Sequence, residues 1–265
     1  MKVFYLFLIT ISTSYSSVFA RNNTDLKEMS VLGKVKSIFE YTIPIRTNSS
    51  NNIKVENIEK SIIFFNEFGF ISFEKNTNGK NIGVLQSKFS YDYKNNLINY
   101  KINILKKEKG IKKTVSKYHY STGKVVVNTT FKNKLINREI IQYLKNNVRA
   151  VKMYDYDANG KIVRLVYHKR FYYNNEKQLL KTELYLPKYN TNDEYLDWKE
   201  EFFYTSKSHR FPNRKNVYLY DNLPNNCKLY QYSFKYKFDE KGNWIERSII
   251  DNYVEVKIKR QINYF

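Results

Sequence analysis

The chain has 265 residues, of which 42% are apolar and 17% aromatic, a content that excludes a disordered protein and suffices for a buried core. Its formal net charge of +21 indicates anionic partners, and its few glycines and prolines (8 and 4) exclude collagen-like and linker-rich chains. The single cysteine, Cys227, excludes an internal disulfide, and we expect it to be a buried or half-buried small apolar residue.

The first 20 residues have the pattern of a secretory signal peptide. Lys2 supplies the positive charge, residues 3–11 form an apolar run, and small residues precede a cleavage point after Ala20. The apolar run is too short for a bilayer, which needs roughly 20 residues. We therefore expect a periplasmic or extracellular protein without a transmembrane segment after cleavage, and a mature charge of +20 because only Lys2 is removed.

After a linker over residues 21–30, period-2 alternation predicts β-strands through residues 31–265, which we interpret as one domain. Residues 135–144 also have a partly helical spacing, but we favour a strand there. Five aromatic residues alternate on one face of residues 229–238, and residues 254–264 alternate as a closing strand. Short polar clusters supply the positive φ of tight hairpins at 78–79, 95–96, 159–160 and 241–243.

Several of these hairpins resemble one another in sequence. Tyr-Asp-Tyr-Asp-Ala-Asn-Gly-Lys-Ile at 154–162 matches Tyr-Lys-Phe-Asp-Glu-Lys-Gly-Asn-Trp at 236–244, and weaker copies centre on residues 65, 93, 120 and 173. A single hairpin cannot bury its aromatic face, so neighbouring units must pair or stack. The pattern predicts an all-β fold: an antiparallel sheet of successive irregular β-hairpin repeats, open and elongated or partly curled.

These motifs resemble the YD repeats of RHS-type proteins. The segments 32–37 and 259–264 are also similar to small exported proteins of Bacteroidota that carry such repeats. The resemblance implies a β-rich exported protein, with carbohydrate binding as one expected role. The short length, the irregular spacing and the lack of a toxin-like C-terminal domain argue against toxin delivery.

Motifs for cofactor chemistry are absent from the sequence. No pattern of histidines and cysteines has the spacing of a zinc site, and no glycine-rich loop between a strand and a helix indicates a nucleotide. We expect the three histidines, His119, His168 and His209, to be ordinary surface or half-buried residues. The sequence therefore predicts no cofactor and no metal.

The only dense acidic stretch, residues 193–201, is a candidate glycan site. On a regular strand Asp197 and Glu201 would share one face, with Trp198 on the other. A flat ring beside carboxylates can hold a sugar, and two carboxylates can cleave a glycosidic bond. The alternative is that these acids pair with neighbouring basic residues on a solvated surface.

A lysine cluster marks another predicted hairpin tip and would attract phosphate or uronate polymers. It comprises Lys106, Lys107, Lys109, Lys112 and Lys113. Export argues against nucleic acid as the partner, and lysines can also simply protect sheet edges or reflect AT-rich coding.

These observations predict a secreted or periplasmic non-enzymatic protein. Its basic, aromatic β surface would bind an anionic glycan or another envelope component. The alternatives are a glycan-active enzyme that uses acidic residues near Trp198, and a purely structural repeat protein.

Overall fold

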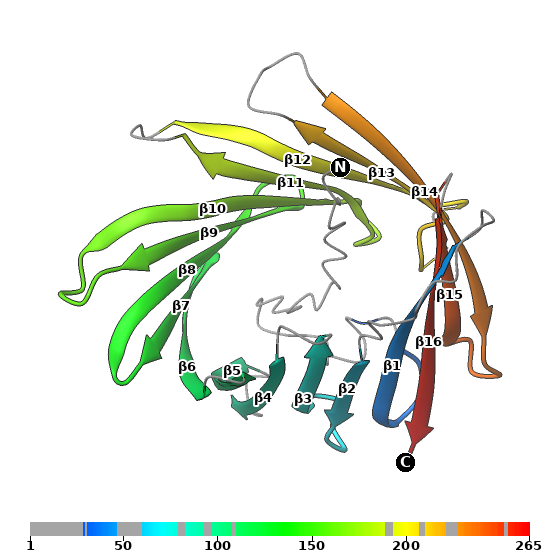
Figure 1. The fold of residues 1–265 in the computed structure, drawn as a ribbon, viewed down its shortest axis with the longest axis horizontal. Helices are drawn as coiled ribbons and strands as arrows, with labels where there is room; N and C mark the ends of the chain where they lie inside the picture. The colour runs from blue at the N-terminus through cyan, green and yellow to red at the C-terminus, as the bar shows by residue number, and fades with distance from the viewer. Residues whose placement is uncertain are drawn as a thin grey trace.

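The protein is a closed antiparallel β-barrel in the computed structural model, which describes residues 29, 31–46, 60–78, 83–92, 97–107, 110–188, 193–206, 210–220, 227–251 and 254–265. Sixteen strands in this described part follow one another around the barrel in chain order (Figure 1). They are β1 (Val35–Arg46), β2 (Lys60–Phe65), β3 (Ile71–Asn78), β4 (Gly83–Asp92), β5 (Leu97–Lys107), β6 (Gly110–Ser121), β7 (Lys124–Phe131), β8 (Lys134–Leu144), β9 (Val148–Tyr156), β10 (Ile162–Tyr173), β11 (Leu179–Pro187), β12 (Glu194–Phe203), β13 (Arg214–Tyr220), β14 (Cys227–Phe238), β15 (Trp244–Ile250) and β16 (Val254–Tyr264).

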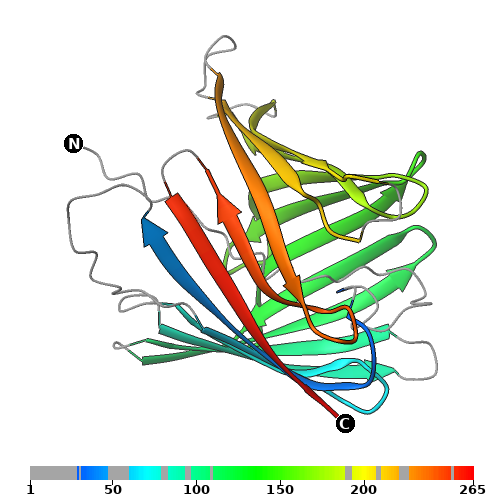
Figure 2. The same cartoon turned by 90° about the vertical axis from the view of Figure 1, so that its right-hand side faces the viewer.

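The first and last strands close the barrel. β1 pairs with β16 along its whole length, from Val35 opposite Tyr264 to Arg46 opposite Val254. Figure 2 shows the two strands side by side, one blue and one red. Arg260 reinforces the seam because its Nε donates to Glu40 Oε2 over 2.7 Å.

The prediction of an open or partly curled sheet is therefore wrong, because the sheet has no free edge at β1 or β16. Closure also conflicts with the YD-repeat, RHS-like interpretation, which requires hairpin units stacked in a row. The strands at 135–144 and 229–238 and the closing strand at 254–264 are confirmed. Cys227 is exposed, contrary to expectation.

A recurring turn explains why the hairpin motifs resemble one another. Asp157 Oδ1 accepts hydrogen bonds from the backbone N–H groups of Asn159 and Lys161, while Gly160 N–H donates to the Asp157 carbonyl. Gly160 has a φ of +78°, which glycine adopts without strain. The same backbone pattern closes the turns that begin at Asn66, Asn174 and Asp239. The predicted turns at 159–160 and 241–243 are thus confirmed, whereas Gly79, Asn95 and Asn96 lie outside the described residues.

One face of the barrel wall contains the core. Residues directly opposite each other on neighbouring strands share a face, and the register places the four apolar clusters on the same face. Their most buried members include Ile38, Ile98, Val125 and Trp244. Side chains converge on the concave side of a closed sheet, so this face lines the lumen.

The opposite face points outward and is polar on many strands. On β16 it presents Glu255, Lys257, Lys259, Gln261 and Asn263 along the length of the strand. The aromatic residues of β14 face the lumen instead, where Tyr236 packs against the Trp244 cluster. The lumenal face thus combines the aromatic and apolar clusters with charged residues such as Glu40 and Arg260. The outward face is mixed: it is charged at many positions and apolar at others, among them Ile62, Ile102 and Val126.

Candidate functional site

The outward face of β2–β8 is the strongest candidate for a binding surface. We call it the basic outer wall, because the strand register places basic residues there at many positions along the strands. They are Lys60, Lys75, Lys88, Lys106, Lys113, Lys117, Lys124 and Arg138.

Acidic residues are nearly missing from this wall within the part of the chain that the structure describes. Glu74 and Glu139 lie on the lumenal face of β3 and β8, opposite Ser87 and Val127. Only Asp92, at the end of β4, is placed outward by alternation. None of the basic residues of the wall forms an ion pair with a described residue, so their charges are available to an external anion.

Aromatic rings lie directly beside two of the lysines. Phe73 is opposite Lys88, and Tyr100, which is 41% exposed, is opposite Lys117. The ring of Phe64 lies 6.0 Å from that of Phe73. A flat ring can pack on the face of a sugar while an adjacent ammonium group attracts its carboxylate or sulfate.

Strand geometry sets the distances between the charges. Lys117 and Arg138 lie in one register row with Asn128 between them, so two strand spacings separate them, about 10 Å. Lys113 and Lys117 are four residues apart on β6, about 14 Å. Both separations exceed the Debye length of about 8 Å at physiological salt, so a small anion interacts with only part of the wall at a time. A polymer can contact several of its basic residues.

The outer face of β9–β16 differs because its acidic residues are paired with basic ones. Glu183 accepts hydrogen bonds from the hydroxyls of Tyr172 and Tyr185, over 2.6 and 2.8 Å. It also forms an ion pair with Lys181. Glu194 binds His168 Nδ1 over 2.6 Å and Lys152 Nζ over 3.1 Å. Glu246, on β15, is bound by Lys237 and Lys259.

The predicted lysine cluster is divided by the barrel wall. Lys106 and Lys113 are exposed on the basic outer wall. Lys112 lies on the lumenal side, with its Nζ 5.4 Å from the centre of the Phe131 ring. The Lys107 side chain and the whole of Lys109 lie outside the described residues.

The predicted acidic site near Trp198 lies on an irregular part of β12. A bulge between Leu184 and Tyr185 on the β11–β12 ladder interrupts the alternation at Asp197. Trp198 faces the lumen, whereas Glu201 faces outward and binds Lys199 Nζ and the Tyr218 hydroxyl over 2.9 Å each.

The electrostatics of these acids also differ. Burial raises the pKa of Asp197. Burial also acts to raise the pKa of Glu201, but hydrogen bonds from Lys199 and Tyr218 outweigh it and lower that pKa. The neighbouring acid on the lumenal side, Glu200, is paired with Lys215 over 2.8 Å. Glu200 and Glu201 thus lie on opposite sides of the wall, whereas a glycosidase needs its two carboxylates on one side.

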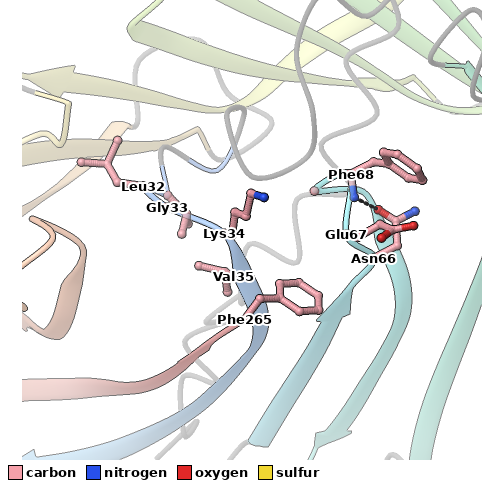
Figure 3. A pocket seen from close by; sticks show the side chains of 10 residues that line it. Leu32, Gly33, Lys34, Val35, Asn66, Glu67, Phe68 and Phe265 are labelled. Atoms are coloured by element: carbon pink, nitrogen blue, oxygen red, sulfur yellow. Dashed lines mark hydrogen bonds between the residues drawn. The ribbon is translucent and has the colours of Figure 1, made fainter.

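A small pocket lies where the segment before β1 meets the β2–β3 turn (Figure 3). Its volume is 280 Å³, and Leu32, Phe68 and Phe265 line it with exposed apolar side chains. Lys34 and Glu67 are its charged lining residues. The lining can accommodate a small apolar group, and it contains no predicted site residue.

Sequence reasoning missed most of the basic outer wall. Lys88, Lys117 and the two rings opposite them come from four different strands, β3 to β6. Alternation within each strand separates its two faces, but only the register between strands brings these residues together. No set of three His, Cys, Asp or Glu residues in the described part is arranged to hold a metal ion.

No family model and no curated protein matches the chain. Among solved structures, a protein of unknown function from Bacteroides fragilis has 17% identity and a TM-score of 0.36, covering 42% of this chain and 87% of its own. Porin-like proteins from Bacteroides uniformis and Bacteroides vulgatus each have 9% identity, with TM-scores of 0.39 and 0.29. They cover 86% and 85% of this chain and 96% and 97% of their own. None of the three is described as a YD-repeat protein, and likenesses this distant carry no functional argument.

Proposed function

We propose that this chain is an exported, non-enzymatic barrel protein that binds an anionic glycan of the cell envelope through the basic outer wall. The observation that carries the proposal is the set of unpaired outward lysines on β3–β7, beside Phe73 and Tyr100. Because the charges are spread over several neighbouring strands, the wall favours a polymer with repeated anionic groups.

Lysines on the outward face support a barrel that stands in water. A barrel that crosses a membrane presents an apolar band to the lipid, and each Lys or Arg at the bilayer midplane costs about 2–4 kcal/mol. Outward lysines occur at successive positions on β14 and β16, at Lys235, Lys237, Lys257 and Lys259. In the described part of the chain, no helix is long and apolar enough to cross a bilayer.

Binding of the full mature chain to alginate, a polyuronate, tests the proposal. We expect binding at low salt that weakens steeply as the salt concentration rises, and no binding to neutral dextran. The double variant Lys88→Gln/Lys117→Gln should bind alginate about tenfold more weakly, since each lost contact is worth several tenths of a kcal/mol or more.

The matched control is Lys237→Gln/Lys259→Gln, which removes the same charge from two strands outside the basic outer wall, β14 and β16. It should bind alginate nearly as well as the wild type, because these lysines are engaged by Glu246. Equal weakening by both double variants would show that net charge alone drives binding. Salt-independent binding, or equal binding of dextran, would also contradict the proposal.

A further inference from the structure

A second cationic site lies on the lumenal face, just inside the rim formed by the β8–β9 and β10–β11 turns. Arg149 is the second residue of β9 and lies between Tyr143 on β8 and Phe171 on β10. Lys169 is opposite Val151, the next lumenal residue along β9. Arg149 and Lys169 are therefore diagonal neighbours across one strand pair, roughly 7–8 Å apart at the backbone.

Neither cation has a carboxylate at ion-pair distance in the part of the chain that the structure describes. The nearby acid, Glu139, instead accepts a hydrogen bond from the Tyr167 hydroxyl over 2.6 Å. Burial lowers the pKa of Lys169, and the attraction of Glu139 and Glu200 offsets this only in part. Lys169 is thus a desolvated cation without a close counter-ion.

Arg149 has an unsatisfied donor. Its Nε is buried and has no hydrogen-bond partner among the described residues, although buried polar groups are nearly always bonded. Its guanidinium carbon lies 4.2 Å from the centre of the Phe171 ring, and Lys169 Nζ lies 5.1 Å from that of Tyr167. Ring stacking holds both cations without using their hydrogen-bonding capacity, which leaves donors for an anionic oxygen.

The surroundings of these cations are apolar. Val151, Tyr143 and Phe171 are half-buried on the same lumenal face, and Val151 and Tyr143 pack against the cluster that contains Val125 and Ile141. A ligand whose anionic group reached Arg149 and Lys169 would contact this apolar surface with its remaining atoms.

We propose that Arg149 and Lys169 form a lumenal site for an anionic amphiphile, with a carboxylate or phosphate group on the two cations and an apolar body against Phe171 and Val151. The site is independent of the basic outer wall, because it lies on the other side of the barrel wall and selects one anionic group rather than a polymer.

Calorimetric titration of the full mature chain with decanoate, decyl phosphate and decanol tests this site. We expect saturable binding of decanoate, decyl phosphate or both, and none of decanol, which lacks the charge. The preferred anion identifies the head group. Arg149→Gln and Lys169→Gln should each weaken binding about tenfold, as expected for a charge-assisted hydrogen bond.

Two further variants separate this result from misfolding and from the outer wall. Arg149→Lys retains the charge but not the fork of donors, and should retain part of the affinity. Lys117→Gln, on the outer wall, should leave decanoate binding unchanged while it weakens alginate binding. Equal binding by wild type and Lys169→Gln, equal binding of decanol, or no binding of either anion would overturn the proposal.

Discussion

Glu183 shows how a charged residue is accommodated on the outer face. It is only 7% exposed, and burial by itself raises its pKa, but hydrogen bonds from Lys181, Tyr172 and Tyr185 outweigh that effect and lower it. Because the folded pKa lies below the unfolded one, the stabilisation is present above the unfolded value near 4.3. It is lost as the pH falls through the folded pKa.

We therefore expect Glu183→Gln to lower the free energy of unfolding by about 1–3 kcal/mol at pH 7, since two tyrosine hydroxyls lose a charged acceptor. Urea denaturation at several pH values measures this, and the difference from wild type should shrink as Glu183 becomes protonated. Glu246→Gln is the control, because its partner Lys237 has a 72% exposed side chain and the variant should change stability little. A loss at pH 7 no larger than that of the control would contradict this account.

Asp197 is the opposite case. Burial raises its pKa, and no described residue forms a hydrogen bond or ion pair with its carboxylate. A raised carboxyl pKa means that ionisation opposes folding, so stability falls as the pH rises from the unfolded value near 3.9 through the folded pKa.

Asp197→Asn should consequently stabilise the protein at pH 7, by up to about 1 kcal/mol because the site is only half-buried. The gain should disappear in acid, which thermal melting at pH 3 and pH 7 would detect. A loss of stability at pH 7 would mean that the negative charge has a partner or a role that geometry does not indicate.

At the level of the elements, the recurring hairpin turn places one residue at positive φ. Glycine occupies it at Gly69, Gly160 and Gly242, whereas the β10–β11 turn has Lys177 there, at φ +62°. A side chain in this left-handed region is strained, and glycine relieves the strain.

Two substitutions at this position should change the free energy of unfolding in opposite directions. Lys177→Gly should raise the free energy of unfolding by about 0.5–1 kcal/mol, and Gly160→Ala should lower it by about 1–2 kcal/mol. An added Cβ at Gly160 would meet no atom within 4 Å, so its effect is purely conformational. Chemical denaturation of both variants tests this, and changes of the same sign would refute the assignment.

At the level of the whole molecule, the outward charges predict behaviour toward lipid. The mature chain should remain monodisperse without detergent, and it should not insert into neutral phosphatidylcholine vesicles, since outward lysines on β3–β7, β14 and β16 interrupt the apolar surface that insertion needs. Size-exclusion chromatography and vesicle flotation measure this. Flotation of the protein with neutral vesicles in a form resistant to high salt would contradict a barrel that stands in water.

The sequence alone was sufficient for the local structure. Alternation with period 2 predicted the strands, including β14 and β16, because side-chain direction in a strand depends only on position along it. The turn beginning at Asp157 was also predictable, since Asp and Gly satisfy its hydrogen bonds and φ locally.

Tertiary structure alone decided the closure, the faces and the site. The seam joins residues more than 200 positions apart, such as Glu40 and Arg260, and no local pattern specifies that pairing. One extra residue in a strand moves the following side chains to the other face, and alternation along the sequence did not predict the bulge at Asp197. The basic outer wall likewise exists only because register aligns lysines of separate strands. The sequence shows only the net positive charge. The closed sheet decides where the basic residues lie, with unpaired lysines on the outside and desolvated cations in the lumen.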